Sequence, residues 1–495
     1  MIRVALALAL LAVPAAAQTP KLGTIAFPTS GTTAAQEHFL RGVLYLHSFE
    51  YGSAARAFRS AQEVEPGFAM AYWGEAMTYN HPLWGEWDET AARAALAKLA
   101  PTAQARRALP PTERERLYLD AVEALWAEGP KPQRDSAYHR ALERLSEAQP
   151  DDDEARAFLA LATLGLTGTT RVFASYMRAA AIAHPVFLRN PDHPGAAHYL
   201  IHAFDDPIHA PLGLPAARAY SRIAPDAAHA QHMTTHIFLA LGMWDDVVSQ
   251  NTLAADQTGW GPGHYTAWLG YGLLQQGRFA DASAHLARAR RELASPSRGG
   301  QRGYLVSMRA HHVINTERWD DSTLTWTIDV TGAGPMSPAA DDFVRGFAAV
   351  RRGDLIAARA SLAAMAARAG APAGANALRL ALEGAIAHAA GDGDAAVRLL
   401  REATVIEDDL PFEFGPPVIV KPTHELLGEV LSALGRPAEA QRAFDRALEL
   451  APKRALALRG LARAATAAGD TPKAEWAMNV LREIWRGSER WLSVR

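Results

Sequence analysis

The sequence of 495 residues contains no cysteine. This absence excludes disulfide bonds, thiolate metal ligands, a cysteine nucleophile and the lipid-bearing cysteine of a lipoprotein. A metal ion in this protein must therefore be held by nitrogen or oxygen atoms. The net charge is also small, −3 from 50 basic and 53 acidic residues. Neither nucleic acid nor an anionic membrane is indicated as a partner.

Long apolar runs are absent beyond the N-terminus. No later segment approaches about 18 uninterrupted apolar residues, so we expect no membrane span in the mature chain. The first residues differ, because the charged start ending at Arg3 is followed by an apolar run, Val4 to Val13, and by the small residues up to Ala17. This order is typical of a signal peptide, here residues 1–17, cleaved after Ala17. We therefore predict a periplasmic or secreted protein; a hydrophobic first helix is the alternative.

Familiar catalytic motifs are missing: there is no phosphate-binding loop, GxSxG elbow, HExxH pair or dinucleotide-binding glycine pattern. The sequence instead repeats itself. Phe39–Pro66 places small and aromatic residues at intervals typical of two antiparallel helices closed by a proline, and Pro422–Pro452 repeats the arrangement. The equivalent residues are Gly42, Ala54, Phe58, Ala61 and Pro66 in the first segment and Gly428, Ala440, Phe444, Ala447 and Pro452 in the second.

The second segment, PTHELLGEVLSALGRPAEAQRAFDRALELAP, resembles the tetratricopeptide repeat consensus. The resemblance implies an all-α solenoid, a right-handed superhelix of helical hairpins whose first helices line a concave groove, chiefly with repeat positions 2, 5, 9, 12 and 13. We expect one array over residues 38–487, between an extended segment at 18–37 and a tail at 488–495, stabilised by packing between neighbouring hairpins. Phasing gives about twelve hairpins, at 38–66, 69–101, 112–150, 153–191, 194–225, 228–257, 263–295, 303–334, 339–371, 377–408, 421–452 and 455–487.

Two pairs of histidines recur in register. His198 and His202 are four positions apart on the chain, as are His232 and His236. Each member of the second pair follows its counterpart by one repeat length, about 34 residues. Residues four apart lie on one face of a helix and can present two imidazoles to the same ion. Counting back from Gly242 puts both pairs at positions 5 and 9, which the resemblance places on the groove. Duplication of one ancestral repeat is an alternative explanation for the recurrence of the histidine pair.

The same repeat phase places three more histidines at groove positions: His229 and His264 at position 2 and His311 at position 9. Neighbouring packed helices lie about 8–10 Å apart, so side chains from two of them can reach one ion or two adjacent ions. The candidate metal ligands are His198, His202, His229, His232, His236, His264 and His311. Each of them could instead be a surface histidine or a hydrogen-bonded core residue.

Several other groove residues carry two interpretations. His47 and His81 are also separated by one repeat length, at position 13, but packing against nearby aromatic side chains explains them as well. Glu425 and Glu429 fall at positions 5 and 9 of their hairpin, where a solvated charged wall is the alternative to ligation. Whether these four approach the central histidines depends on the curvature of the superhelix.

Asp205 and Asp206 follow His202 closely. They are either hydrogen-bond partners of a ligating histidine or residues that end a helix.

An imidazole-rich site without sulfur suits zinc, copper, iron or nickel, and we predict a divalent transition metal, zinc, copper or iron. The protein would then be a metalloenzyme using metal-activated water or redox chemistry, or a metal-delivery or storage protein. The competing hypothesis is a scaffold whose groove holds a peptide or part of an envelope protein, with the histidines supplying hydrogen bonds or pH sensitivity. A small molecule is a further candidate occupant of the groove.

The runs PGAAHYLIHAFDDPIHA and IAPDAAHAQHMTTHIFLALGMW, between residues 194 and 244, resemble a group of exported bacterial tetratricopeptide-repeat proteins with histidine-rich stretches. The resemblance implies export and a repeat architecture. No activity transfers with it, because a fold alone does not establish a function.

Overall fold

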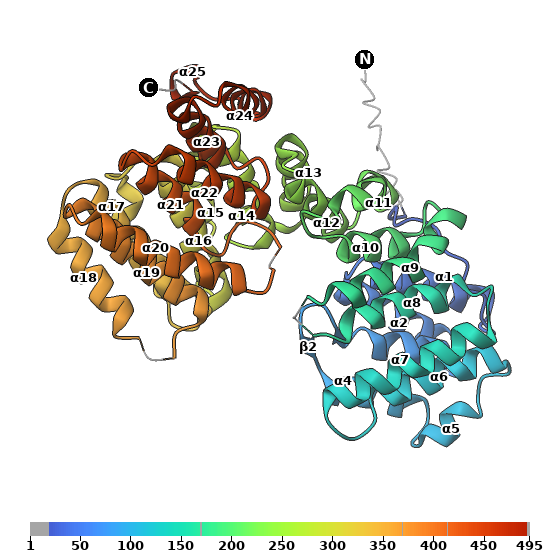
Figure 1. The fold of residues 1–495 in the computed structure, drawn as a ribbon. Coiled ribbons are helices and arrows are strands. Elements are labelled where there is room, and N and C mark those ends of the chain that lie inside the picture. The colour runs from blue at the N-terminus through green and yellow to red at the C-terminus, as the bar shows by residue number, and fades with distance from the viewer. Residues whose placement is uncertain (1–18, 169–170, 369, 413, 493–495) are drawn as a thin grey trace, which may run out of the picture.

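The computed structural model describes residues 19–168, 171–368, 370–412 and 414–492. The predicted signal peptide, 1–17, lies outside this range. The described residues form an all-α solenoid of 25 α-helices, with one 3-10 helix, η1 (Ser322–Thr325), and two short antiparallel strands, β1 (Asn80–His81) and β2 (Glu86–Trp87) (Figure 1).

The helices of the first half are α1 Thr33–His47, α2 Tyr51–Val64, α3 Ala69–Met77, α4 Glu89–Leu99, α5 Ala103–Arg107, α6 Glu113–Leu125, α7 Lys131–Ala148, α8 Asp153–Gly165, α9 Phe173–Arg189, α10 Pro194–Ala203, α11 Ala210–Ile223, α12 Ala228–Ala240 and α13 Trp244–Thr258. Those of the second half are α14 His264–Gln275, α15 Phe279–Arg291, α16 Gly299–Thr316, α17 Ser337–Arg351, α18 Leu355–Ala366, α19 Ala373–Ala389, α20 Gly393–Asp409, α21 Thr423–Ala433, α22 Pro437–Leu450, α23 Ala455–Ala468, α24 Thr471–Ile484 and α25 Glu489–Leu492.

A phenylalanine wedged between two glycines joins successive hairpins. A Cβ added at Gly42 or Gly74 would lie 2.6 or 2.3 Å from the ring of Phe58. The same arrangement returns near the C-terminus, where Phe444 packs between Gly428 and Gly460. Because any side chain at these glycines would overlap the ring, the small–aromatic–small pattern sets how closely neighbouring hairpins approach. The two equivalent segments of the sequence therefore share one packing solution.

Eleven of the twelve predicted hairpin segments contain two α-helices. The eighth, 303–334, does not: α16 is followed only by η1 and an irregular segment that runs to α17. Its second half, DDSTLTWTIDVTGAG, is rich in threonine, aspartate and glycine, which are poor helix formers. Asp321 bonds the backbone N–H of Thr323 at 2.9 Å, so its carboxylate stabilises a turn in place of a helix.

The boundaries of the array differ slightly from the sequence prediction. The first helix begins at Thr33, inside the segment expected to be extended, and α25 lies within the expected tail. Among the described residues, none of the helices combines the length and the apolar character needed to cross a membrane.

The solenoid makes a turn in each half of the chain, so that helices far apart in the sequence come into contact. In the first half α1 packs against α10 (Figure 1). In the second half α23 meets α13 and α14, where Ala455 donates its backbone N–H to Gln275 at 3.0 Å and the indole of Trp244 donates to the carbonyl of Lys453 at 3.2 Å. Helices α10, α12 and α14 therefore lie between the two turns, and they carry the central histidines.

Candidate metal centre

Six histidines from three helices converge at this junction. Helix α10 carries two of them, α12 carries three, and α14 begins with the sixth; they are His198, His202, His229, His232, His236 and His264. They form two groups in which the candidate ligand atoms all lie within 4.8 Å of one another, an inner group of His198, His202 and His229 and an outer group of His232, His236 and His264. The ring centroids of His202 and His236 are 6.0 Å apart, so the groups adjoin.

Burial distinguishes the two groups. Every residue of α10 is buried, as are His229, His232 and His236 on α12. We expected these histidines on an open groove, whereas packing between the two turns covers them. His264 is the exception, because its side chain is exposed. The inner group is therefore enclosed, and the outer group is open on one side.

The inner group contains three buried nitrogen atoms without hydrogen bonds. Nδ1 of His198 donates to the backbone carbonyl of His47 at 2.7 Å, so its Nε2 carries the lone pair. That atom and Nε2 of His202 and of His229 have no hydrogen-bond partner among the described residues. Leaving one buried polar atom unpaired costs about 1–3 kcal/mol, and such atoms are rare. Three of them gathered in one place indicate a site for a ligand.

In the outer group, two imidazole Nε2 atoms face each other. Nδ1 of His232 lies 2.7 Å from Oδ1 of Asn251, and Nδ1 of His236 lies 2.5 Å from the carboxylate of Asp205. Both Nδ1 atoms donate to these acceptors, and burial lowers the pKa of His232, so its Nε2 carries a lone pair. Nε2 of His236 lies only 3.0 Å from this lone pair.

The amide of Asn251 leaves little freedom in this assignment. Its Nδ2 donates to the carbonyl of Val247 at 2.9 Å and to the hydroxyl of Thr235 at 3.2 Å. Its Oδ1 must therefore face His232. A cation held between the two Nε2 atoms, either a proton or a metal ion, makes the 3.0 Å contact favourable.

Burial keeps the imidazoles of the inner group and of His232 neutral. Burial lowers the pKa of His198 to about 3, and burial together with the neighbouring imidazoles lowers the pKa of His202, His229 and His232 well below the ordinary value. At neutral pH these rings are uncharged, which is the form that ligates metal.

Aromatic side chains cover the histidines. Phe49 stacks on His202 and His229, with ring centroids 5.9 and 5.4 Å away, and Trp268 lies 4.4 Å from His236. The backbone of Phe49 has φ 55°, a left-handed conformation that costs a non-glycine residue about 1 kcal/mol or more and is concentrated at functional sites. This strained residue fixes the rings of the inner group.

A cavity of about 900 Å³ borders the outer group. His236 and Asp205 form part of its wall on the side of the histidine helices. The opposite wall comes from segments near residues 407–422 and 446–452 in the second half of the chain. The histidine centre therefore adjoins a partly open cavity large enough for a small molecule.

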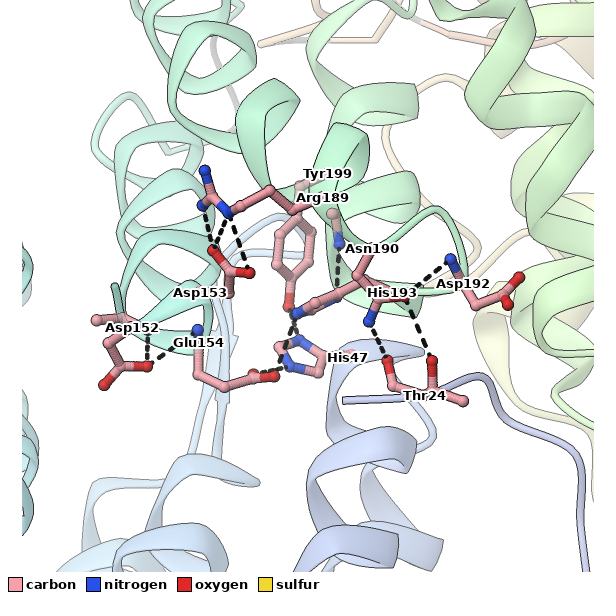
Figure 2. Close-up of polar contacts among 12 residues, drawn as sticks. Thr24, His47, Asp152, Asp153, Glu154, Arg189, Asn190, Asp192, His193 and Tyr199 are labelled. Atoms are coloured by element: carbon pink, nitrogen blue, oxygen red, sulfur yellow. Dashed lines mark hydrogen bonds and ion pairs between the residues drawn. The ribbon is translucent and has the colours of Figure 1, made fainter. Parts of the chain in front are cut away.

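A third group, His47, Glu154 and His193, is buried beside the inner group (Figure 2). Nε2 of His47 donates to Glu154 at 2.7 Å, and its Nδ1 accepts from the hydroxyl of Tyr199 at 2.9 Å. Nδ1 of His193 accepts the backbone N–H of Ala196, so its proton is on Nε2, which lies 3.2 Å from Glu154. Nε2 of His47 is hydrogen-bonded to the carboxylate, whereas Nε2 of His193 lies at ion-pair distance from it without an aligned hydrogen bond. The carboxylate pairs with both imidazoles, and this paired network distinguishes the third group from the other two, which consist of imidazoles alone.

The charge on Glu154 fits this network. Burial alone would raise the pKa of Glu154, but the imidazoles of His193 and His47 outweigh it and lower the pKa to about 2. Helix α10 approaches closely here, because a Cβ at Gly195 would lie 2.3 Å from Nδ1 of His47. The network thus holds α1, α8 and α10 together and positions the His47 carbonyl that orients His198.

The comparisons with known proteins bear on the fold. A family model described as tetratricopeptide repeat matches residues 431–495. The match covers the C-terminal hairpins, and the rest of the described chain shares their helical-hairpin architecture. No match is found among curated proteins.

The solved structures to which the chain shows some similarity include a human IFIT1 dimer with m7Gppp-AAAA, 12% identical over 92% of this chain and 90% of that one, TM-score 0.35. Another is the APC/C hetero-tetramer Cut9-Hcn1, 13% identical over 92% of this chain and 94% of that one, TM-score 0.31. At these TM-scores the two structures say nothing about what this chain binds.

The remaining candidates from the sequence lie apart from the six histidines. His311 packs against Tyr271, with ring centroids 5.1 Å apart, and belongs to neither group. His81 stacks on Tyr51 at 3.8 Å and bonds the carbonyl of Thr78.

The two groove glutamates are also distant. Glu425 is buried in ion pairs with Lys421 and Arg454, and Glu429 pairs with Lys421 as well. These acids neutralise buried cations of the second half and are not held near the histidine groups.

The sequence analysis missed Asn251, Glu154 and His193. Asn251 and His193 do not occupy groove positions. Glu154 does fall at position 2 of its hairpin, but its partner His47 lies 107 residues away along the chain. His193 did offer a signal, since it directly precedes Pro194 and its side chain caps α10 by accepting the N–H of Ala196. Histidine is not among the preferred capping residues, so a histidine in this place points to a second role.

Proposed function

We propose that this protein binds two transition-metal ions in the six-histidine centre, one in each group of three. The observation that carries the proposal is the 3.0 Å contact between Nε2 of His232 and Nε2 of His236, with His264 beside them. In a tetrahedral zinc site, bonds of about 2.0–2.1 Å place the nitrogen ligands about 3.4 Å apart. The pair is close to that spacing already, and rotation of the His264 side chain would close the group.

The donor set suits zinc, copper, iron or nickel. It consists of imidazoles, without thiolate or carboxylate ligands, and imidazole sites suit these ions. Carboxylate and amide oxygens are instead placed behind His236 and His232, where they orient the rings and raise their basicity. Three protein ligands and an open side are typical of catalytic zinc sites. The inner group also offers three imidazoles, so an ion there needs a further ligand such as water to complete its coordination.

Elemental analysis of tag-free protein by plasma mass spectrometry tests the proposal. We expect about two ions per chain, falling to one or none in the double variant His232→Ala, His236→Ala. His184→Ala is the matched control, because His184 is an exposed histidine on α9 outside all three groups. Wild-type protein that stays empty after loading with zinc and with copper, followed by dialysis, contradicts the proposal, as does equal metal content in the double variant.

A peptide-binding scaffold is the alternative function, since solenoids of this kind use concave surfaces to bind partners. The burial of five of the six histidines favours metal, because a peptide cannot lie across side chains that are between 0 and 6% exposed. A scaffold also gives no reason for unpaired nitrogen atoms in the interior.

Export is part of the proposal through the predicted signal peptide. N-terminal sequencing of protein from the periplasmic fraction tests it, with Gln18 expected as the first residue. Protein retained in the cytoplasm with Met1 in place would contradict export without affecting the metal proposal.

A further inference from the structure

We infer that the cavity beside His236 binds a small, uncharged and mainly apolar organic molecule with one nitrogen or oxygen donor atom, and that this donor meets the ion of the outer group. The last step rests on the proposed metal centre. The cavity volume of about 900 Å³ lies in the range of sites for small molecules, about 300–1,000 Å³.

The walls of the cavity are apolar and partly aromatic. The side chains that define them include Trp244, Tyr271, Met336, Phe412, Ile419 and Leu448. Prolines such as Pro335, Pro372 and Pro417 form much of the remaining lining. Proline has no backbone N–H, so these stretches offer few donors to a carboxylate or phosphate. The lining therefore suits an apolar ligand and not an anion.

The charged groups at the cavity support the same conclusion. Five carboxylates, Asp205, Asp206, Glu407, Asp408 and Glu449, line it together with one guanidinium, Arg446. An anion would meet this excess of negative charge.

A cation would find these carboxylates already engaged. Asp206 pairs with Arg171, and Arg446 pairs with both Asp408 and Glu449. Glu407 accepts two hydrogen bonds from Thr423, and Asp205 accepts from His236. Only an uncharged molecule avoids both repulsion and the loss of existing pairs.

The position of His236 fixes the orientation of the ligand. This residue lines the cavity, whereas the other two histidines of the outer group and all three of the inner group do not. A molecule with its apolar body against Trp244 and Tyr271 has its polar end next to this histidine. A donor atom there can take the coordination position that the three imidazoles leave open.

Binding to the cavity is tested first on metal-free protein with Nile red, an uncharged apolar dye. We expect saturable fluorescence that 4-phenylimidazole displaces and phenylacetate does not. In Ala373→Trp, a bulky ring added at an exposed position on the cavity wall should weaken dye binding at least tenfold. Ala363→Trp, at an exposed position on α18 away from the cavity, should bind as wild type does. Absent dye binding, or equal binding in the two variants, overturns the inference.

Cobalt-loaded protein tests the contact with the ion. We expect 4-phenylimidazole to shift the visible absorption of bound cobalt at concentrations at least tenfold below those needed with imidazole, and Ala373→Trp to remove the difference. If cobalt stays bound and its spectrum does not change on addition of 4-phenylimidazole, the proposed contact between the ligand and the ion is overturned. Protein that retains no cobalt counts against the metal centre itself, and the displacement of Nile red then decides the cavity alone.

Discussion

The carboxylate of Asp205 lies 2.5 Å from Nδ1 of His236 and thereby joins the end of α10 to the middle of α12. The contact determines which nitrogen of His236 faces the outer group, because the donor to a carboxylate must carry the proton. A carboxylate behind a ligating imidazole also raises its basicity.

Replacing this carboxylate should weaken metal binding without unfolding the protein. For Asp205→Asn we expect a loss of affinity of about 10–100-fold, the usual effect of removing a partner behind a ligand. Competition with a chromogenic chelator measures it. The control is Asp192→Asn at an exposed aspartate, which should leave the affinity unchanged. Equal affinity in the Asp205 variant would show that its carboxylate does not support a ligand.

The metal-free protein should lose stability in mild acid. Burial first, and the nearby imidazoles second, lower the pKa of His198 to about 3 in the folded protein, whereas the unfolded chain has the ordinary value of 6.5. Between these values the unfolded state binds more protons, so the contribution to stability is complete above pH 6.5 and is lost as the pH falls towards 3. Urea unfolding at pH 8, 7, 6 and 5 measures this. We expect similar midpoints at pH 8 and 7 and a decline below, with a shallower decline in His198→Asn; identical slopes would refute the assignment.

Glu154 should matter for stability and not for metal content. In Glu154→Ala two buried imidazoles lose their carboxylate partner, and breaking a buried ion pair by removing one partner costs about 3–5 kcal/mol. Glu154→Gln retains an acceptor oxygen and should cost less. Urea unfolding and plasma mass spectrometry together provide the two measurements. Metal lost in Glu154→Gln at unchanged stability would place an ion in the third group and contradict its description as a paired network.

The close approach of α10 to α1 can be tested with a single methyl group. In Gly195→Ala the new Cβ would lie 2.3 Å from Nδ1 of His47, so the helix must shift. Overpacking of this kind costs about 1–3 kcal/mol. Gly67→Ala is the control, because a Cβ there meets no atom within 4 Å and the backbone does not require glycine. Similar unfolding midpoints for the two variants would mean that the gap between α1 and α10 is wider than described.

Most of the helical architecture could be predicted because it is local. The hairpin segments follow from spacing within a single repeat length, and the wedges at Phe58 and Phe444 recur with the same neighbours along the chain. The prediction of the eighth hairpin was wrong because its second helix was assigned only from the phase of the repeat. The threonine-rich segment after Arg318 disfavours a helix there.

The histidine centre could be predicted only in part. A spacing of one repeat length identified the pairs on α10 and α12, and phase added His229 and His264, which the structure brings alongside them. The same phase included His311, which lies apart because its hairpin is the irregular one. Contacts that span long distances, such as His47 to Glu154 or His236 to the segment after Asp408, depend on how the two turns close, and a repeat pattern contains no information on that curvature.

Helix α12 supplies candidate ligands to both groups, His229 to the inner one and His232 and His236 to the outer one. A rigid helix cannot adjust one set of side chains independently of the other. An ion that settles in the inner group therefore fixes the rotation of α12 and, with it, the geometry offered to a second ion. The two sites should therefore fill cooperatively: an ion in the enclosed inner group orders α12 and raises the affinity of the open outer group for a second ion.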